Sequence, residues 1–277
     1  MALSLASISA EAVTRAPRGL VLGPPKIGKS EFACGASFKN GKRVAIGLNN
    51  PIVLPISGEE GVDSLPVPKF PTLGSVSEVL EALWVLRTED HKHDTVVIDS
   101  ATSLERLIWA ELVDKHNAKH INDGKVLGFA NGFKLAAKEF GRVLKSIDVL
   151  REKKNMASFF IGHVEVKRFD DPDASSYDRY QFSVQKEAAA LFEEWADVTL
   201  FCNSKVFVQT EDVGFNREKK RAMDVTGGQR FLFTQQRPSH PGGGRGDYGH
   251  LPYELPLDYA VFQEEVRKAM HNTNEGE

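Results

Sequence analysis

The segment GPPKIGKS, residues 23–30, matches the pattern G-x-x-x-x-G-K-[ST], which wraps backbone around phosphate groups. It stands between an apolar run and a segment of helical periodicity, the strand–loop–helix context that the pattern requires. Backbone N–H groups would cradle the phosphates, Lys29 would reach the β- and γ-phosphates, and the Ser30 hydroxyl would ligate Mg²⁺. The sequence therefore predicts a site for ATP and Mg²⁺ formed by Gly23, Pro24, Pro25, Lys26, Ile27, Gly28, Lys29, Ser30 and Glu31.

A phosphate site of this kind needs a second metal ligand, usually a carboxylate at the end of a buried strand. The segment TVVIDS supplies an apolar run that ends in Asp99. We expect Asp99 to complete the metal site with Ser30. The alternative is that Asp99 caps the helix that follows.

Hydrolysis also needs a group that orients or deprotonates the attacking water. The segment ISGEEG places Glu59 and Glu60 just after another predicted strand, and either is a candidate base. The alternative is a solvated acidic turn. His163 ends a further strand, FFIGH, where it would sense the γ-phosphate or serve only as a hydrogen-bonded structural residue.

These residues need a scaffold that brings strand ends together. Short apolar runs alternate with helix-period segments, which predicts an α/β fold with a mainly parallel sheet flanked by helices. The expected strands are 19–22, 52–56, 95–99, 158–162 and 198–201. The expected helices are 29–38, 76–86, 104–115, 133–151, 186–195 and 257–270. Three apolar runs, 205–209, 221–225 and 230–234, predict an antiparallel C-terminal extension of the same sheet.

Composition limits the classes of function. A formal net charge of -3 argues against coating nucleic acid by bulk charge, so any such contact requires a local patch. Two cysteines in 277 residues are typical of a reducing compartment, and no window approaches the ~20 apolar residues of a membrane span. We expect a cytoplasmic protein with no membrane partner.

The order of these motifs resembles the RecA-type ATPase core. More closely, the chain resembles the phage-encoded RecA-core ATPases of the Sak type, an AAA-family group linked to single-strand annealing and recombination. The resemblance covers about residues 18–262 and includes IGHVEVKRF, YDRYQFSVQKEAAALFEEWADVTLF, RFLFTQQRP and LPYELPLDYAVF. It implies a RecA-like P-loop NTPase domain over 18–271, between an N-terminal arm, 1–17, and a disordered tail, 272–277.

The resemblance also assigns roles. It gives the activating glutamate to Glu59, with Glu60 one step beyond, and puts His163 where RecA proteins usually have Gln. Residues 116–125 take the place of a first DNA loop and 164–185 of a second. The DNA-binding candidates in the second loop combine cations and aromatic rings, which suits sequence-tolerant binding of single strands: Lys167, Arg168, Phe169, Arg179 and Tyr180. Four aspartates in the same segment favour the alternative of a plain surface loop.

The glycine-rich segment around Arg245 corresponds to a region that reaches the neighbouring nucleotide in RecA-type oligomers. Arg245, or in second place Arg237, would act there as an arginine finger. Gly244 precedes Arg245, whereas Sak-type chains tend to have Lys or Asn. The alternative is a basic residue in a mobile linker.

Together these features predict an ATPase that assembles into a ring or filament, binds single-stranded DNA and hydrolyses ATP in a DNA-stimulated way. Its partners would include a phage single-strand binding or annealing protein. The first alternative is a small-molecule kinase, although no compact arginine cluster typical of a kinase lid is present between Asp99 and Asp197 beyond the loop with Lys167, Arg168 and Arg179. The second is a nucleotide-gated adaptor or loader for a recombinase, annealing protein or helicase. A packaging or helicase motor is a third.

Overall fold

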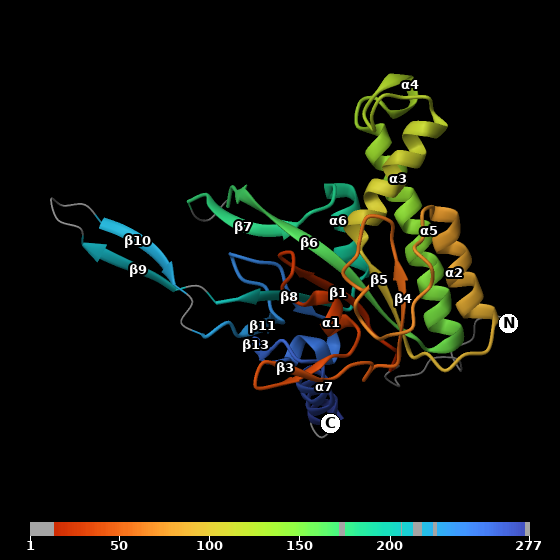
Figure 1. Ribbon diagram of the computed structural model, residues 1–277. Helices are drawn as coiled ribbons and strands as arrows, with labels where there is room; N and C mark the ends of the chain where they lie inside the picture. Colours follow the sequence, from red (N-terminus) through yellow and green to blue (C-terminus); the bar gives the residue numbers. More distant parts are fainter. Residues whose placement is uncertain (1–13, 172–174, 206, 213–217, 224–225, 275–277) are drawn as a thin grey trace, which may run out of the picture.

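The structure is a computed structural model that describes residues 14–171, 175–205, 207–212, 218–223 and 226–274. Its centre is a sheet with five parallel strands, in the spatial order β8-β1-β6-β5-β4 (Figure 1). These strands are β1 (Arg18–Gly23), β4 (Pro51–Pro55), β5 (Thr95–Asp99), β6 (Ala157–Phe169) and β8 (Val198–Ser204). The order confirms the predicted α/β fold with a mainly parallel sheet, and it places β6 between the strands that carry the phosphate loop and Asp99.

Both faces of the sheet are covered, because the apolar residues of each buried strand alternate between two cores. One core joins Leu20, Leu54 and Ile98 to a layer of four helices. These are α2 (Val76–Thr88), α3 (Ala101–Lys115), α5 (Asn131–Lys154) and α6 (Lys186–Trp195). The other core joins Val21 and Val97 to α1 (Lys29–Ala33) and α7 (Tyr259–Asn274). Parallel pairing with β6 brings Gly23, at the end of β1, and Asp99, at the end of β5, close to His163.

The antiparallel extension is present but smaller than expected. In the part of the chain that the structure describes, only β11 (Arg230–Phe233), β12 (Gly243–Gly244) and β13 (Glu254–Pro256) join the main sheet on the β8 side. β9 (Phe207–Asp212) and β10 (Glu218–Met223) pair only with each other within the described residues and project as a separate arm (Figure 1). The prediction that all three C-terminal runs extend one sheet was therefore wrong for the first two.

The helix expected over 29–38 is also shorter than predicted. α1 ends at Ala33, because Cys34 closes the helix and Gly35 adopts a positive φ of 71°. The chain then forms a hairpin of β2 (Ser37–Lys39) and β3 (Lys42–Ala45). A side chain at Gly35 would collide with the backbone of Leu48, so this turn requires glycine. The hairpin lies beside the phosphate loop as a result.

None of the helices in the described ranges is long and apolar enough to cross a membrane. Residues 1–13 of the expected N-terminal arm and 275–277 of the expected tail lie outside the described residues. The described end of the arm contacts α5, because the carbonyl of Ala16 accepts a hydrogen bond from the Arg151 side chain at 2.6 Å.

Candidate nucleotide and DNA site

The phosphate loop joins β1 to α1, as its sequence pattern predicts. Lys29 is 5% exposed, and its Nζ donates hydrogen bonds to the carbonyl oxygens of Gly23 at 2.9 Å and Pro24 at 2.8 Å. Burial lowers the pKa of Lys29, although the nearby carboxylates Asp99 and Glu59 favour its charged form. The ammonium group is thus held inside the loop that would surround the phosphates.

Ser30 and Asp99 meet at the carboxyl edge of the sheet. The Ser30 hydroxyl donates to Asp99 Oδ2 at 2.9 Å, and Asp99 is 2% exposed at the end of β5. Burial raises the pKa of Asp99 to about 6, although the hydrogen bond from Ser30 acts to lower it. A Cβ added at Gly61 would lie only 3.2 Å from Ser30 Oγ and 3.5 Å from Asp99 Oδ2, so glycine leaves space beside both oxygens. This oxygen pair with open space fits Mg²⁺, which takes one or two protein ligands and fills its other positions with water and phosphate.

Glu59 lies in the site, whereas Glu60 does not. Gly58 turns the chain after β4 with a φ of 94°, and Glu59 Oε1 then accepts hydrogen bonds from Ser100 Oγ at 2.7 Å and Ser103 Oγ at 2.9 Å. Burial alone would raise the pKa of Glu59, but its hydrogen bonds, with that of His163 the strongest, lower it to about 2. Glu59 is therefore a carboxylate at neutral pH. Glu60 is exposed and is not among the described residues that line the cavity.

His163 lies next to the phosphate loop, since it pairs in register with Gly23 across β6 and β1. Its Nε2 is 3.1 Å from Glu59 Oε1, and its backbone N–H donates to Thr102 Oγ1 at 3.1 Å. Its Nδ1 is buried and has no hydrogen-bond partner among the described residues. His163 does not end its strand as predicted, because β6 continues to Phe169, and its imidazole connects the middle of β6 to the candidate base.

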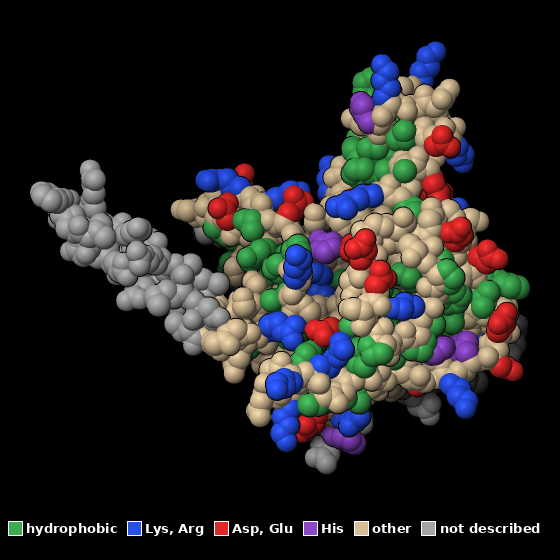
Figure 2. Space-filling view, in the orientation of Figure 1, with side chains coloured by type: hydrophobic (Ala, Val, Ile, Leu, Met, Phe, Trp, Pro, Cys, Tyr) green, Lys and Arg blue, Asp and Glu red, His purple; other side chains and the backbone are tan. Residues whose placement is uncertain are grey.

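These groups line one cavity of about 450 Å³. Two arginines that sequence reasoning missed line it as well: Arg43 in β3 and Arg230 at the start of β11. No motif identifies either residue, because each reaches the site only through the folding of the β2–β3 hairpin and the antiparallel extension. In Figure 2, Lys and Arg side chains gather with an acidic one over α1 and this hairpin.

The predicted second DNA loop, 164–185, is a β-hairpin and not a loop. β6 continues to Phe169 and pairs antiparallel with β7 (Tyr177–Phe182), so that backbone groups of the two strands satisfy one another. The Arg179 guanidinium lies 4.9 Å from the centre of the Phe169 ring, and its Nε is buried without a hydrogen-bond partner among the described residues. Four of the five predicted DNA-binding residues line a cavity of about 520 Å³ between the hairpin and α6: Lys167, Phe169, Arg179 and Tyr180.

Arg168 is the exception among these five residues. Its side chain is 71% exposed, lies 3.8 Å from a carboxylate oxygen of Asp170, and is not among the described residues lining that cavity. Residues 116–125, the predicted first DNA loop, run from the end of α3 to the short helix α4 (Gly124–Leu127) at a projecting tip (Figure 1). Phe129, just beyond α4, is completely exposed.

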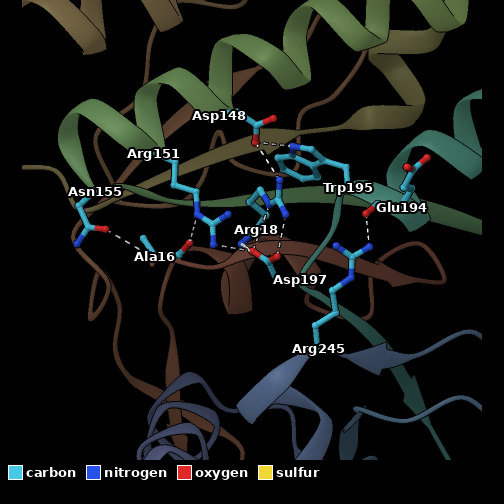
Figure 3. A network of polar contacts seen from close by, with 9 residues as sticks. All are labelled: Ala16, Arg18, Asp148, Arg151, Asn155, Glu194, Trp195, Asp197 and Arg245. Carbon is cyan, nitrogen blue, oxygen red and sulfur yellow. Dashed lines mark hydrogen bonds and ion pairs between the residues drawn. The ribbon is translucent and has the colours of Figure 1, made fainter. Parts of the chain in front are cut away.

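Arg245 lies at the opposite edge of the sheet from the phosphate loop of its own chain. Gly244 pairs with Val198 at the amino end of β8, whereas the loop follows the carboxyl end of the parallel strand β1. The Arg245 side chain donates a hydrogen bond to the carbonyl oxygen of Glu194, next to the ion pairs that Asp197 makes with Arg18 and Arg151 (Figure 3). A catalytic contact of Arg245 therefore requires a second protomer. Arg237 is likewise outside the described lining of the nucleotide cavity, with its guanidinium 4.1 Å from the ring centre of Tyr253.

The fold and the site together define a P-loop NTPase. A family model described as the AAA domain matches residues 15–246, so the chain belongs to that family. Among solved structures, a crystal structure of the RadB recombinase matches with a TM-score of 0.40 and 14% identity, over 82% of this chain and 85% of that one. A comparison with curated proteins gives no match.

Proposed function

We propose that this protein is an ATPase that binds single-stranded DNA and acts in recombination or annealing, as its Sak-type sequence features suggest. The observation that carries the proposal is the cavity beside the β6–β7 hairpin, where three cations and three aromatic rings come together: Lys167, Arg179, Lys186, Phe169, Tyr180 and Phe182. Cations that meet phosphates and rings that stack on bases are the two requirements of sequence-tolerant single-strand binding. The hairpin is continuous with β6, which also carries His163 of the nucleotide site.

The proposed chemistry follows from the nucleotide site. Glu59, held as a carboxylate by two serine hydroxyls and His163, orients a water for in-line attack on the γ-phosphate. Lys29 stabilises the charge that develops on the phosphate oxygens. Ser30 and Asp99 would hold Mg²⁺, which neutralises phosphate charge when bound.

His163 supplies the proposed coupling between the two sites. Its imidazole contacts Glu59, and Val164, the next residue, begins the pairing of β6 with β7. A shift of Glu59 towards a bound γ-phosphate would therefore move His163 and, with it, the residues where the pairing of β6 with β7 begins. DNA at the hairpin would act on Glu59 by the same contact, because coupling between two sites is reciprocal.

The DNA proposal is tested by measuring affinity for a fluorescent single-stranded oligonucleotide over a salt series. Lys167→Ala and Arg179→Ala should each weaken binding and reduce the slope of log affinity against log salt by about 0.7, the value for one lost phosphate contact on a single strand. Arg168→Ala is the matched control, since it removes a cation of the same hairpin that does not line the cavity. Equal effects from all three variants would contradict the proposed location.

Two observations favour a second candidate function, the nucleotide-gated adaptor. Carboxylates occupy the same hairpin, where Lys167 Nζ lies 2.8 Å from Glu165 Oε1. The projecting tip also exposes Phe129 completely and Val126 to 45%, which suits protein contact. If wild-type protein binds ATP but no single-stranded DNA, this adaptor function takes precedence.

A further inference from the structure

The nucleotide cavity has two chemically different ends. At one end Asp99, Glu59 and His163 surround the position of the metal and the γ-phosphate, on the β5 and β6 side of the loop. The other end lies on the β8 and β11 side and is lined by Glu31, Arg43 and Arg230. A triphosphate whose γ-phosphate lies at the first end extends its α-phosphate and nucleoside towards the second.

Arg230 rests directly on the phosphate loop of its own chain. It is the first residue of β11 and pairs with Ser204 at the carboxyl end of β8, which places it on the same sheet edge as the loop. One guanidinium nitrogen, Nη1, donates to the Ile27 carbonyl oxygen at 3.2 Å, and a Cβ added at Gly28 would lie only 2.4 Å from that nitrogen. The absence of a side chain at Gly28 is thus what admits the guanidinium.

The orientation of this guanidinium is set by a ring and a carboxylate. Its carbon lies 4.8 Å from the ring centre of Phe38 in β2, and Nη1 is 3.4 Å from Glu31 Oε2. Arg43 Nη1 contacts the other oxygen of Glu31 at 3.0 Å. Two guanidinium groups therefore share one carboxylate, which leaves one positive charge in excess at this end of the cavity.

We infer that Arg230, supported by Arg43 and Glu31, recognises the nucleoside end of the bound nucleotide, namely the α-phosphate and ribose, within one protomer. The inference rests on the proposed nucleotide binding at the phosphate loop and adds the residues that separate a nucleotide from a bare polyphosphate. The part-buried Arg230 side chain, 29% exposed, faces the cavity from a strand and not from a mobile loop. This role is distinct from the arginine finger, which Arg245 could supply only from a second protomer.

Calorimetric titration with three Mg²⁺ complexes tests the inference: those of ADP, of ATP and of inorganic tripolyphosphate. Arg230→Ala should weaken the binding of ADP and ATP by about 10- to 100-fold, as expected for a charge-assisted hydrogen bond. It should weaken the binding of tripolyphosphate less, because tripolyphosphate has a phosphate in the α position but no ribose. Lys29→Ala should weaken the binding of all three complexes. Lys205→Ala is the matched control, because Lys205 pairs with Glu254 at 2.6 Å and lies 4.5 Å from the ring centre of Phe231 in β11, outside the described lining of the cavity.

Arg230→Gln gives a second variant in case the alanine protein does not fold, since the amide can still donate to Ile27 while the charge is lost. It should reproduce the selective loss of ADP and ATP. Unchanged nucleotide affinity in the folded variants, or an equal loss of tripolyphosphate, would overturn the inference. A wild-type protein that binds none of the three complexes would instead refute the proposed nucleotide binding itself.

Discussion

At the scale of single residues, two adjacent glutamates differ completely in environment. Glu59 accepts three side-chain hydrogen bonds in the cavity, whereas Glu60 is exposed. Glu59→Gln removes the charge but preserves the shape. We expect it to reduce steady-state ATP turnover by about 10²- to 10⁴-fold, the usual contribution of a positioned general base, while nucleotide affinity is retained.

Glu60→Gln controls for the same chemical change one position along the chain and should turn over ATP at the wild-type rate. Both variants are measured for turnover and for ATP affinity, so that a loss of binding is separated from a loss of chemistry. A strong loss of turnover in Glu60→Gln with normal activity in Glu59→Gln would reverse the assignment.

The residues predicted from sequence are those whose neighbours along the chain define them. Lys29, Ser30 and Asp99 stand in contiguous motifs, and each lies in the nucleotide cavity of the structure. The sequence left the choice between Glu59 and Glu60 open, because both follow the same strand and only the positive φ of Gly58 and the serines of α3 distinguish them. Arg230 was not predicted, since its contact with Ile27 joins segments that are 203 residues apart.

At the scale of elements, Glu105 connects α3 to the start of α6 beneath the hairpin. Its carboxylate, 6% exposed, accepts a hydrogen bond from the Gln185 backbone at 2.8 Å. Burial raises the pKa of Glu105 to about 7, although the backbone hydrogen bond from Gln185 acts to lower it. The folded state thus binds this proton more tightly than the unfolded state, so the contribution of Glu105 to stability falls as pH rises from 4.5 to about 7.

Glu105→Gln removes this titration and keeps an oxygen acceptor for Gln185. The stability of the variant relative to wild type should therefore increase between pH 4.5 and pH 8, by an upper limit of about 3 kcal/mol. Urea unfolding of both proteins at several pH values measures the difference and cancels the titration of all other groups. Parallel pH profiles for the two proteins would show that Glu105 has an ordinary pKa.

Elements were predictable where one periodicity ran without interruption. The strand over 95–99 and the helix over 186–195 have the predicted bounds, because each is a buried run or an amphipathic stripe with clear ends. The hairpins were not predictable in the same way. Strand pairing in β2–β3 and β6–β7 depends on partners and packing that local sequence does not encode, and polar strand residues at 164–169 resemble those of a loop.

At the scale of the whole molecule, the position of Arg245 allows a test of whether the protein acts as an oligomer. Its own phosphate loop lies at the far edge of the sheet, so a finger role needs a neighbouring copy. Arg245→Ala, which retains Lys29, and Lys29→Ala, which retains Arg245, should each be inactive alone. Mixing them should restore part of the wild-type turnover, because some sites then combine an intact loop with an intact arginine.

Turnover of the mixture is compared with the sum of the separate variants at the same total concentration, and sedimentation reports the assembly state of each. Full activity of Arg245→Ala alone would exclude a finger role for this residue. A mixture no more active than its components would show that Arg245 and Lys29 do not act across an interface.

The central claim is that one chain couples a nucleotide site to a DNA site through β6 and its hairpin. The most direct measurement is the steady-state ATPase rate of wild-type protein with and without single-stranded DNA. The same rate measured on Glu59→Gln gives the background. We expect measurable hydrolysis that rises when single-stranded DNA is added and is lost in Glu59→Gln. A rate that DNA leaves unchanged at concentrations that saturate binding would contradict it.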